Sequence, residues 1–520
     1  MVGDNEITKR RTFMKKLLVS LICVFLICGF VFAGGSNEKA ASSSGEVKYK
    51  ESIVLGDGSQ ITTGDPQSIN NMQHNRIFKC SHNTLVSYNS STSSYEPELA
   101  TSWEWSSDLL TLTLKLRNDV TFQNGEKFTA NDVKYSYERI MDMNSTASSK
   151  FVGVLDHVEV VDDYTVKLVL VKPNVDWLDT LALPLASIVN QKAIEADELK
   201  GPWVGTGMWI ITALEEGDYV KMVKNENYWG GTTPTKELTF RYIPEESARL
   251  IALQNGEIDV CIGPADTEIE YIRNDKNLVL IEIPSATCCY FSFNTSKGPG
   301  SDENLRLALA HCINYEDVIF GASSGTGTRA ISNWGPVTFG YYDGFGDYTR
   351  DLDLAKQYLE KSAYKEILIS VRDDERMRAA QIIQANAREI GLTVTIEKIE
   401  AAALTAKSAF KTAEHESMIY TLGWNSYGDD ASRAYGVGSN TNKATLSDDR
   451  VMELLEIGRS TTDTAARKEA YAEIQTLNHE HAWYLPLYYT GLAVATRVGV
   501  SGVIWEGHQS HDYQNIVATI

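Results

Sequence analysis

Cysteine is scarce in this sequence, with only seven among 520 residues. No two of them show the CxxC spacing of a zinc or redox site. Five follow residue 33, at positions 80, 261, 288, 289 and 312. Their number is odd, and the neighbours Cys288 and Cys289 cannot readily pair with each other. We therefore expect buried free thiols rather than a disulfide framework.

Long apolar runs are missing after the N-terminal region. The run from Leu17 to Phe32 is too short for the roughly 20 residues that span a membrane comfortably. Five basic residues precede this run, and it ends at Val31-Phe32-Ala33, which offers a small-residue cleavage site. We expect residues 1–33 to be a signal peptide and residues 34–46, rich in Ser, Ala and Gly, to be a flexible linker.

The basic segment also bears on the export route. Lys9 to Lys15 resembles a twin-arginine signal, which exports folded proteins, but the strongly apolar run after it favours the general secretory route. A bulky isoleucine precedes both Cys23 and Cys28, which disfavours lipoprotein processing. We expect an exported protein, periplasmic or at the extracellular face of the membrane, without a lipid anchor.

The sequence has fewer basic than acidic residues. A chain cut after Ala33 keeps 67 acidic and 43 basic residues, a net charge of −24. Nucleic acids and anionic membrane surfaces would repel such a chain, so neither is an expected partner.

Catalytic and metal-binding motifs are few. Gly321-Ala322-Ser323-Ser324-Gly325 fits the GxSxG pattern of hydrolases, but that elbow must follow a strand and open a helix. Here it ends an amphipathic segment. His479 and His481 lie two residues apart on a predicted helix and so point to different faces, which disfavours a shared metal. Phosphate-cradling motifs are absent. We expect no enzyme activity, no cofactor and no metal site.

The hydrophobic periodicity predicts an α/β fold. Residues 112–116 alternate as a half-buried strand, 158–171 read as a hairpin, and 220–224 as a short strand. Residues 366–371 predict a strand, 377–390 a helix ended by Gly391, and 392–396 another strand, which together make a βαβ unit. Residues 464–481 predict a further amphipathic helix.

One stretch carries a specific family resemblance. Glu98 to Trp105, Leu114 to Phe122 and Asn124 to Arg139 resemble the signature of family 5 of the extracellular solute-binding proteins. Shorter matches follow in family order, at residues 204–207, 225–229, 252–259 and 293–295. Within the signature, Asn124-Gly125 predicts a tight turn, and Thr129 with Asp132 predicts a helix cap.

The resemblance implies a two-lobed periplasmic-binding-protein-like fold with a hinge and an extra β-rich subdomain. We expect lobe I at 47–293, including the subdomain at about 88–200, lobe II at 294–483, and a return to lobe I at 484–520. A solute would bind between the lobes and be enclosed when they close.

The resemblance also suggests residues that contact the solute. In peptide-binding relatives Gly-Trp is followed by two residues and then an Asp, which pairs with the ligand ammonium. Here Tyr427 stands at the position of that Asp, so Asp429 or Asp430 would take its role. Trp424 and Asn425 flank it, Trp424 being either a cleft wall or core. Arg372, with Arg376 and Arg378 as alternatives, would hold the ligand carboxylate. Trp209, Tyr290 and Asn294 complete the candidate ligand-binding set.

The implied function is that of a monomeric receptor that delivers a small solute, most simply a short peptide, to the permease subunits of an ABC transporter. Relatives with this fold bind oligosaccharides or nickel chelates instead. Because Tyr427 is uncharged, such solutes remain alternatives to a peptide. A secreted hydrolase and a sensory or adhesive protein that has lost transport are alternatives from other classes.

Overall fold

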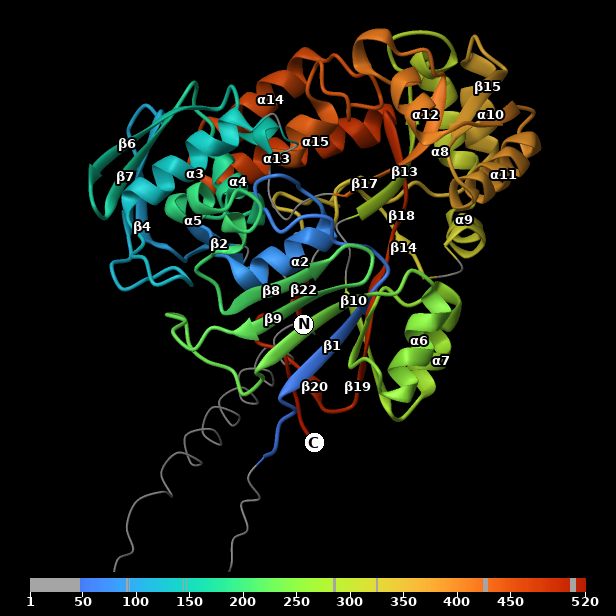
Figure 1. The fold of residues 1–520 in the computed structure, drawn as a ribbon. Helices are drawn as coiled ribbons and strands as arrows, with labels where there is room; N and C mark the ends of the chain where they lie inside the picture. Colours follow the sequence, from blue (N-terminus) through green and yellow to red (C-terminus); the bar gives the residue numbers. More distant parts are fainter. Residues whose placement is uncertain are drawn as a thin grey trace, which may run out of the picture. The chain divides into compact units, whose positions relative to one another are not determined.

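The computed structural model describes residues 47–89, 92, 94–143, 145, 147–283, 287–323, 326–423, 429–505 and 511–520. From Lys48 onward two large sheets organise the chain (Figure 1). The first has seven strands in the order β12-β19-β11-β1-β10-β9-β8. In chain order these are β1 (Ser52–Asp57), β8 (Trp209–Glu215), β9 (Tyr219–Lys224), β10 (Glu237–Tyr242), β11 (Val260–Ile262), β12 (Leu278–Ile283) and β19 (Leu492–Arg497).

The second sheet has six strands in the order β14-β18-β13-β17-β15-β16. They are β13 (Thr287–Phe293), β14 (Thr328–Arg329), β15 (Glu366–Val371), β16 (Thr393–Lys398), β17 (Ser417–Gly423) and β18 (Tyr484–Tyr489). Each sheet is the centre of one lobe, and the chain passes between the lobes from β12 to β13 and again from β18 to β19.

These crossings correct the predicted lobe boundaries. β13 and β18 are antiparallel neighbours inside the second sheet, with Phe291 opposite Leu485. Residues 287–293, expected in the first lobe, and residues 484–489, expected in the return segment, therefore both belong to the second lobe. The chain crosses to the second lobe after β12 and returns after β18. A strand's alternation of side chains shows that it is a strand but not which sheet it joins.

A smaller sheet of four strands, in the order β4-β5-β7-β6, lies within the residues where we expected a β-rich subdomain. Its strands are β4 (Ala100–Trp105), β5 (Thr111–Leu116), β6 (Leu155–Asp162) and β7 (Thr165–Leu170). Three helices accompany it: α3 (Ala130–Asp142), α4 (Trp177–Leu181) and α5 (Gln191–Ala196). The segment packs around its own apolar core, which includes Leu114, Tyr137 and Trp177.

The local predictions in this segment are confirmed. Gly125 has φ of +88°, which an L side chain rarely adopts, so the Asn124-Gly125 turn needs glycine. The Asp132 carboxylate accepts hydrogen bonds from the Thr129 amide at 2.9 Å and the Thr129 hydroxyl at 3.1 Å, which caps α3.

The predicted βαβ unit is also confirmed. β15 and β16 are parallel, and α11 (Asp374–Glu389) connects them, burying Ala380, Ile383 and Ala387. Gly391 follows the helix with φ of +87°, as a left-handed helix terminus requires.

The remaining helices are divided between the two lobes (Figure 1). The first lobe has α2 (Met72–Ser81), α6 (Glu246–Asn255) and α7 (Ile269–Asn274). The second has α8 (Glu303–Cys312), α9 (Tyr315–Ala322), α10 (Leu352–Lys361), α12 (Ala401–Lys407), α13 (Asp429–Tyr435), α14 (Asp449–Arg459) and α15 (Thr464–His481). Short two-stranded pairs complete the fold: β2 (Val86–Asn89) with β3 (Ser94–Pro97), β20 (Val500–Ser501) with β23 (Val517–Ala518), and β21 (Ile504–Trp505) with β22 (His511–Asp512).

The structure also bears on the predicted state of the cysteines and on membrane-spanning helices. All five cysteines of the described region are buried and none forms a disulfide there, as expected. In the same region no helix has both the length and the apolarity of a membrane span.

Candidate functional site

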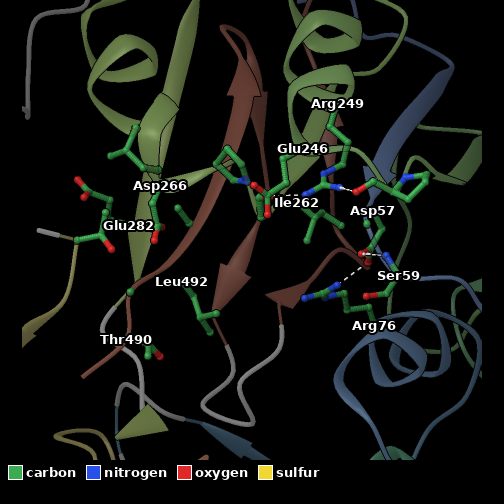
Figure 2. Close-up of a pocket in the computed structure, with 18 of the residues that line it drawn as sticks. Asp57, Ser59, Arg76, Glu246, Arg249, Ile262, Asp266, Glu282, Thr490 and Leu492 are labelled. Carbon is green, nitrogen blue, oxygen red and sulfur yellow. Dashed lines mark hydrogen bonds and ion pairs between the residues drawn. The ribbon is translucent and has the colours of Figure 1, made fainter. Parts of the chain in front are cut away.

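A cavity of about 620 Å³ lies where the two lobes meet (Figure 2). In the first sheet β1 runs parallel to both β10 and β11, so the carboxyl ends of these three strands share one edge. The residues at that edge line the cavity, and Thr326, Thr328 and Thr490 of the second lobe line it from the other side. Open α/β sheets bind their ligands at this edge, and the volume is typical of small-molecule sites, about 300–1,000 Å³.

Buried charges stand in the wall of this cavity. Asp57, the last residue of β1, forms an ion pair with Arg76 of α2, and both side chains are buried. The other oxygen of Asp57 accepts a hydrogen bond from the Ser59 amide at 3.0 Å. Each charge thus has a countercharge, which a charge removed from water requires.

Arg249 of α6 is a second buried cation in the wall, 4% exposed. Its guanidinium donates to the carbonyls of Ile243 at 2.7 Å, Pro244 at 2.9 Å and Gly263 at 2.6 Å. These bonds hold the loops after β10 and β11 in place (Figure 2). Arg249 therefore shapes the carboxyl edge of the first sheet.

Acidic groups complete the lining. Glu246 and Asp266 belong to the first lobe, and Asp266 lines the cavity together with Thr326 of the second. Burial raises the pKa of Asp266, and the negative charges of Glu375 and Glu246 raise it further. Glu375 lies in the first turn of α11, so that turn is close to the cavity.

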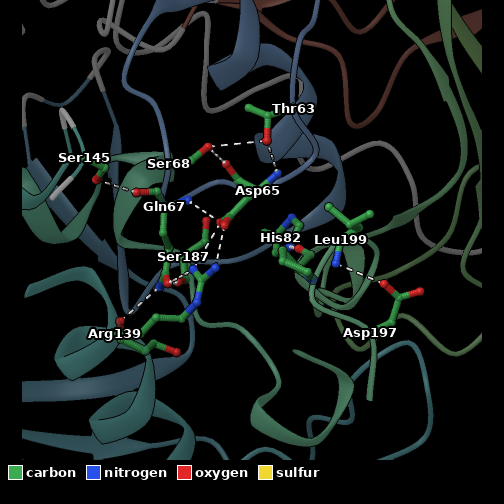
Figure 3. A network of polar contacts seen from close by, with 12 residues as sticks. Thr63, Asp65, Gln67, Ser68, His82, Arg139, Ser145, Ser187, Asp197 and Leu199 are labelled. Carbon is green, nitrogen blue, oxygen red and sulfur yellow. Dashed lines mark hydrogen bonds and ion pairs between the residues drawn. The ribbon is translucent and has the colours of Figure 1, made fainter. Parts of the chain in front are cut away.

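The loop that leaves the cavity after β1 is anchored by polar contacts (Figure 3). Arg139 of α3 donates to both carboxylate oxygens of Asp65, at 2.5 and 3.2 Å, and to the side-chain oxygen of Gln67 at 2.7 Å. The Gln67 amide group in turn donates to the carbonyls of Ser136 and Ser187. The loop beside the cavity is thus fixed to the segment with the four-stranded sheet.

The three arginines predicted for a carboxylate differ in their surroundings. Arg376 is buried and forms an ion pair with Asp373. Arg378 donates to the carbonyls of Gly321 and Ala322. Arg372 has a side chain 36% exposed, pairs with Asp373 at 3.2 Å, and lies 5.8 Å from the ring centre of Tyr420.

Arg372 follows β15 directly, and the segment 424–430 follows β17. These strands are parallel neighbours, so their carboxyl ends lie at the same edge of the second sheet. Trp424, Asn425 and Tyr427 lie outside the described residues, as do the side chains of Asp429 and Asp430, whose backbone begins α13. The topology thus places Arg372 at the same sheet edge as Gly423, the last residue of β17.

Three other candidates lie in the core and do not line the cavity. Trp209 is fully buried, and its indole donates to the Gln514 carbonyl at 2.9 Å. Tyr290 is 1% exposed and packs edge-on against Tyr484. Asn294 is fully buried and donates to the His415 carbonyl at 2.8 Å. These side chains support the sheets and present no surface to a solute.

The catalytic and metal motifs have structural roles. Ser323 ends α9, and its hydroxyl donates to the Ile319 carbonyl at 2.7 Å, so it does not stand on a strand-to-helix elbow. His479 stacks on Tyr348, whereas His481 contacts Glu303 at 2.9 Å. Among the residues that the structure describes, no group of three or more potential metal ligands gathers.

Comparison with known proteins decides the family. The family model of the bacterial extracellular solute-binding proteins, family 5 Middle, matches residues 94–445. The chain belongs to this family. The resemblance seen in the sequence is thereby confirmed.

Relatives of this family 5 protein carry different names. The heme-binding protein A of Haemophilus influenzae is 27% identical, over 78% of this chain and 81% of its own length. The dipeptide-binding protein of Escherichia coli is 26% identical, over 84% and 88%. The structure of HbpA2 from Haemophilus parasuis has a TM-score of 0.82 at 23% identity, covering 90% of this chain and 100% of that one. The two-lobed fold of the periplasmic binding proteins is therefore confirmed.

Sequence reasoning missed the residues that line the cavity. Asp57, Arg76, Arg249 and Asp266 are separated by up to 209 positions, and no local motif joins them. One signal was present, because Asp57 and Asp266 each follow closely after a buried strand, where ligand-contacting loops begin.

Proposed function

We propose that this family 5 protein is an exported, monomeric receptor that captures a short peptide between its lobes and delivers it to the permease of an ABC importer. Membership of a family of solute-binding proteins supports binding, and the Escherichia coli dipeptide-binding relative supports a peptide. The role requires no chemical step, and the position of Ser323 at the end of α9 is consistent with that.

The observation that carries the proposal is the position of the cavity at both lobe crossings. Glu282 lies next to the first crossing, Thr490 and Gly491 form the second, and all three line the cavity. A solute held there contacts both lobes, so it binds the closed arrangement more tightly than an open one and shifts the population toward closure.

The charges suit a zwitterion. Asp266 and Glu246 contribute negative charge to the cavity wall, and Arg372 stands at the neighbouring edge of the second sheet. We propose that Arg372 pairs with the solute carboxylate and that Asp430 or Asp429 pairs with its ammonium, flanked by Trp424 and Asn425. Tyr427 lacks the charge for this task. An ionic group enclosed without a partner is strongly disfavoured.

Mass spectrometry of small molecules that co-purify with the exported protein is the first test, and we expect peptides of two to a few residues. Calorimetry with tri-alanine and with its N-acetylated form then compares the parent with the variants Asp429→Asn, Asp430→Asn and Arg372→Gln. Loss of one partner of a buried charge pair costs on the order of 2–5 kcal/mol, or roughly thirty-fold to several thousand-fold in affinity.

Arg378→Gln is the matched control, because Arg378 bonds to two backbone carbonyls of α9 and should leave affinity unchanged. Parent-like affinity in all three test variants would contradict the assigned residues. Recovery of a heme, a nickel chelate or a sugar in place of peptides would contradict the proposal that the solute is a peptide.

A further inference from the structure

A buried polar cluster joins the lobes away from the cavity. Asp176, immediately before α4, forms an ion pair with Arg467 of α15, and its second carboxylate oxygen accepts a hydrogen bond from the Tyr471 hydroxyl at 2.8 Å. Beside it, the Val175 amide donates to the carbonyl of Arg459, the last residue of α14, at 2.9 Å. α4 belongs to the first lobe and α14 and α15 to the second (Figure 1).

Each half of the cluster is held rigidly within its own lobe. Trp177, next to Asp176, is 2% exposed and donates from its indole to the Lys150 carbonyl at 3.0 Å. On the other side, Arg467 donates to the Gly458 carbonyl at 2.9 Å, and its guanidinium lies 4.5 Å from the ring centre of Phe339. Each half is therefore anchored by contacts within its own lobe.

The cluster is almost completely shielded from solvent. Asp176 is 2% and Tyr471 1% exposed. The Tyr471 ring lies against Gly340 and Gly458, where an added Cβ would come within 2.9 and 2.5 Å of it. Separating Val175 and Asp176 from α14 and α15 would break an ion pair and two hydrogen bonds at once, and none of these residues lines the cavity.

We propose that Asp176, Arg467 and Tyr471 form a latch that holds the second lobe against the four-stranded-sheet part of the first, and so sets solute affinity without touching the solute. This inference rests on the lobe closure of the proposed function. The latch adds to the stability of the closed state and slows the opening that releases the solute, so its loss acts on dissociation more than on association.

The first experiment needs no solute. Hydrogen exchange at the Val175 amide reports whether the lobes are joined, because that N–H donates across the lobe boundary. In the solute-free full-length protein we expect slow exchange in the parent and at least tenfold faster exchange in Asp176→Asn. Tyr471→Phe, which keeps the ring packing, should give a smaller increase. Fast exchange in the parent, or equal rates in parent and Asp176→Asn, would overturn the latch.

The second experiment measures tri-alanine binding by stopped flow. We expect Asp176→Asn to raise the dissociation rate at least tenfold and Tyr471→Phe severalfold, with association within about threefold of the parent. Arg450→Gln is the control, since Arg450 pairs with Glu473 within the second lobe on exposed surface. Lower resistance to urea with an unchanged dissociation rate would mean that the cluster only supports the fold, and would overturn the proposal.

The two proposals fail in different ways. If the parent binds no tri-alanine but its slow Val175 exchange is accelerated by Asp176→Asn, the latch proposal stands and the peptide proposal fails. If the parent binds tri-alanine but Asp176→Asn changes neither the exchange nor the dissociation rate, the receptor proposal stands and the latch proposal fails.

Discussion

Replacing Asp57 with Asn should destabilise the protein by about 3–5 kcal/mol, because it leaves Arg76 buried without a countercharge. Asp57 is 7% and Arg76 8% exposed, so water cannot take over the lost contact. Among the described residues the Arg76 Nε has no hydrogen-bond partner, which leaves the guanidinium dependent on this carboxylate. The replacement amide oxygen can still accept from the Ser59 amide, so the charge is the main loss.

Urea unfolding followed by tryptophan fluorescence measures the effect. The double variant Asp57→Asn with Arg76→Met should recover most of the loss, since replacing both partners of a buried pair by neutral groups is often close to neutral. Glu126→Gln is the control, because Glu126 pairs with Lys192 on exposed surface and should cost less than about 1 kcal/mol. An Asp57→Asn variant within 1 kcal/mol of the parent, or a double variant no more stable than the single, would refute the reasoning.

Two further predictions concern stability. Burial lowers the pKa of His82 to about 4, although the Pro202 carbonyl and the Asp65 charge oppose the shift. The unfolded chain binds this proton near pH 6.5 and the folded one does not, so stability is complete above pH 6.5 and falls by up to about 3 kcal/mol toward pH 4. Urea midpoints across that range should fall less in His82→Gln, and an equal fall would argue against it. Thr129→Ala should cost about 1 kcal/mol by removing the cap of α3, and a loss below 0.3 kcal/mol in the same assay would contradict that role.

Sequence patterns of short range predicted their structures well. The βαβ unit at 366–398 follows from apolar spacing within single elements, and Gly391 ends the helix because its own backbone conformation requires glycine. The cap formed by Thr129 and Asp132 spans three positions. Such features depend on neighbours in the chain, so a single sequence contains the information that specifies them.

Sheet membership was decided only by the tertiary structure. β13 and β18 lie nearly 200 positions apart and pair within the second lobe, which moved both predicted boundaries by a strand length. Trp209 and Asn294, expected at a cleft, are core residues, because an aromatic ring or an amide serves equally well in either place and only packing decides between them.

The cavity depends on the tertiary structure most of all. The sequence by itself determined the family resemblance and the local α/β elements. It did not determine the wall formed by Asp57, Arg76, Arg249 and Asp266, or the latch between Asp176 and Arg467. Those groups come together only because parallel strands distant in the chain end at one edge and because two lobes close upon each other, and such long-range contacts leave no periodic trace in the sequence.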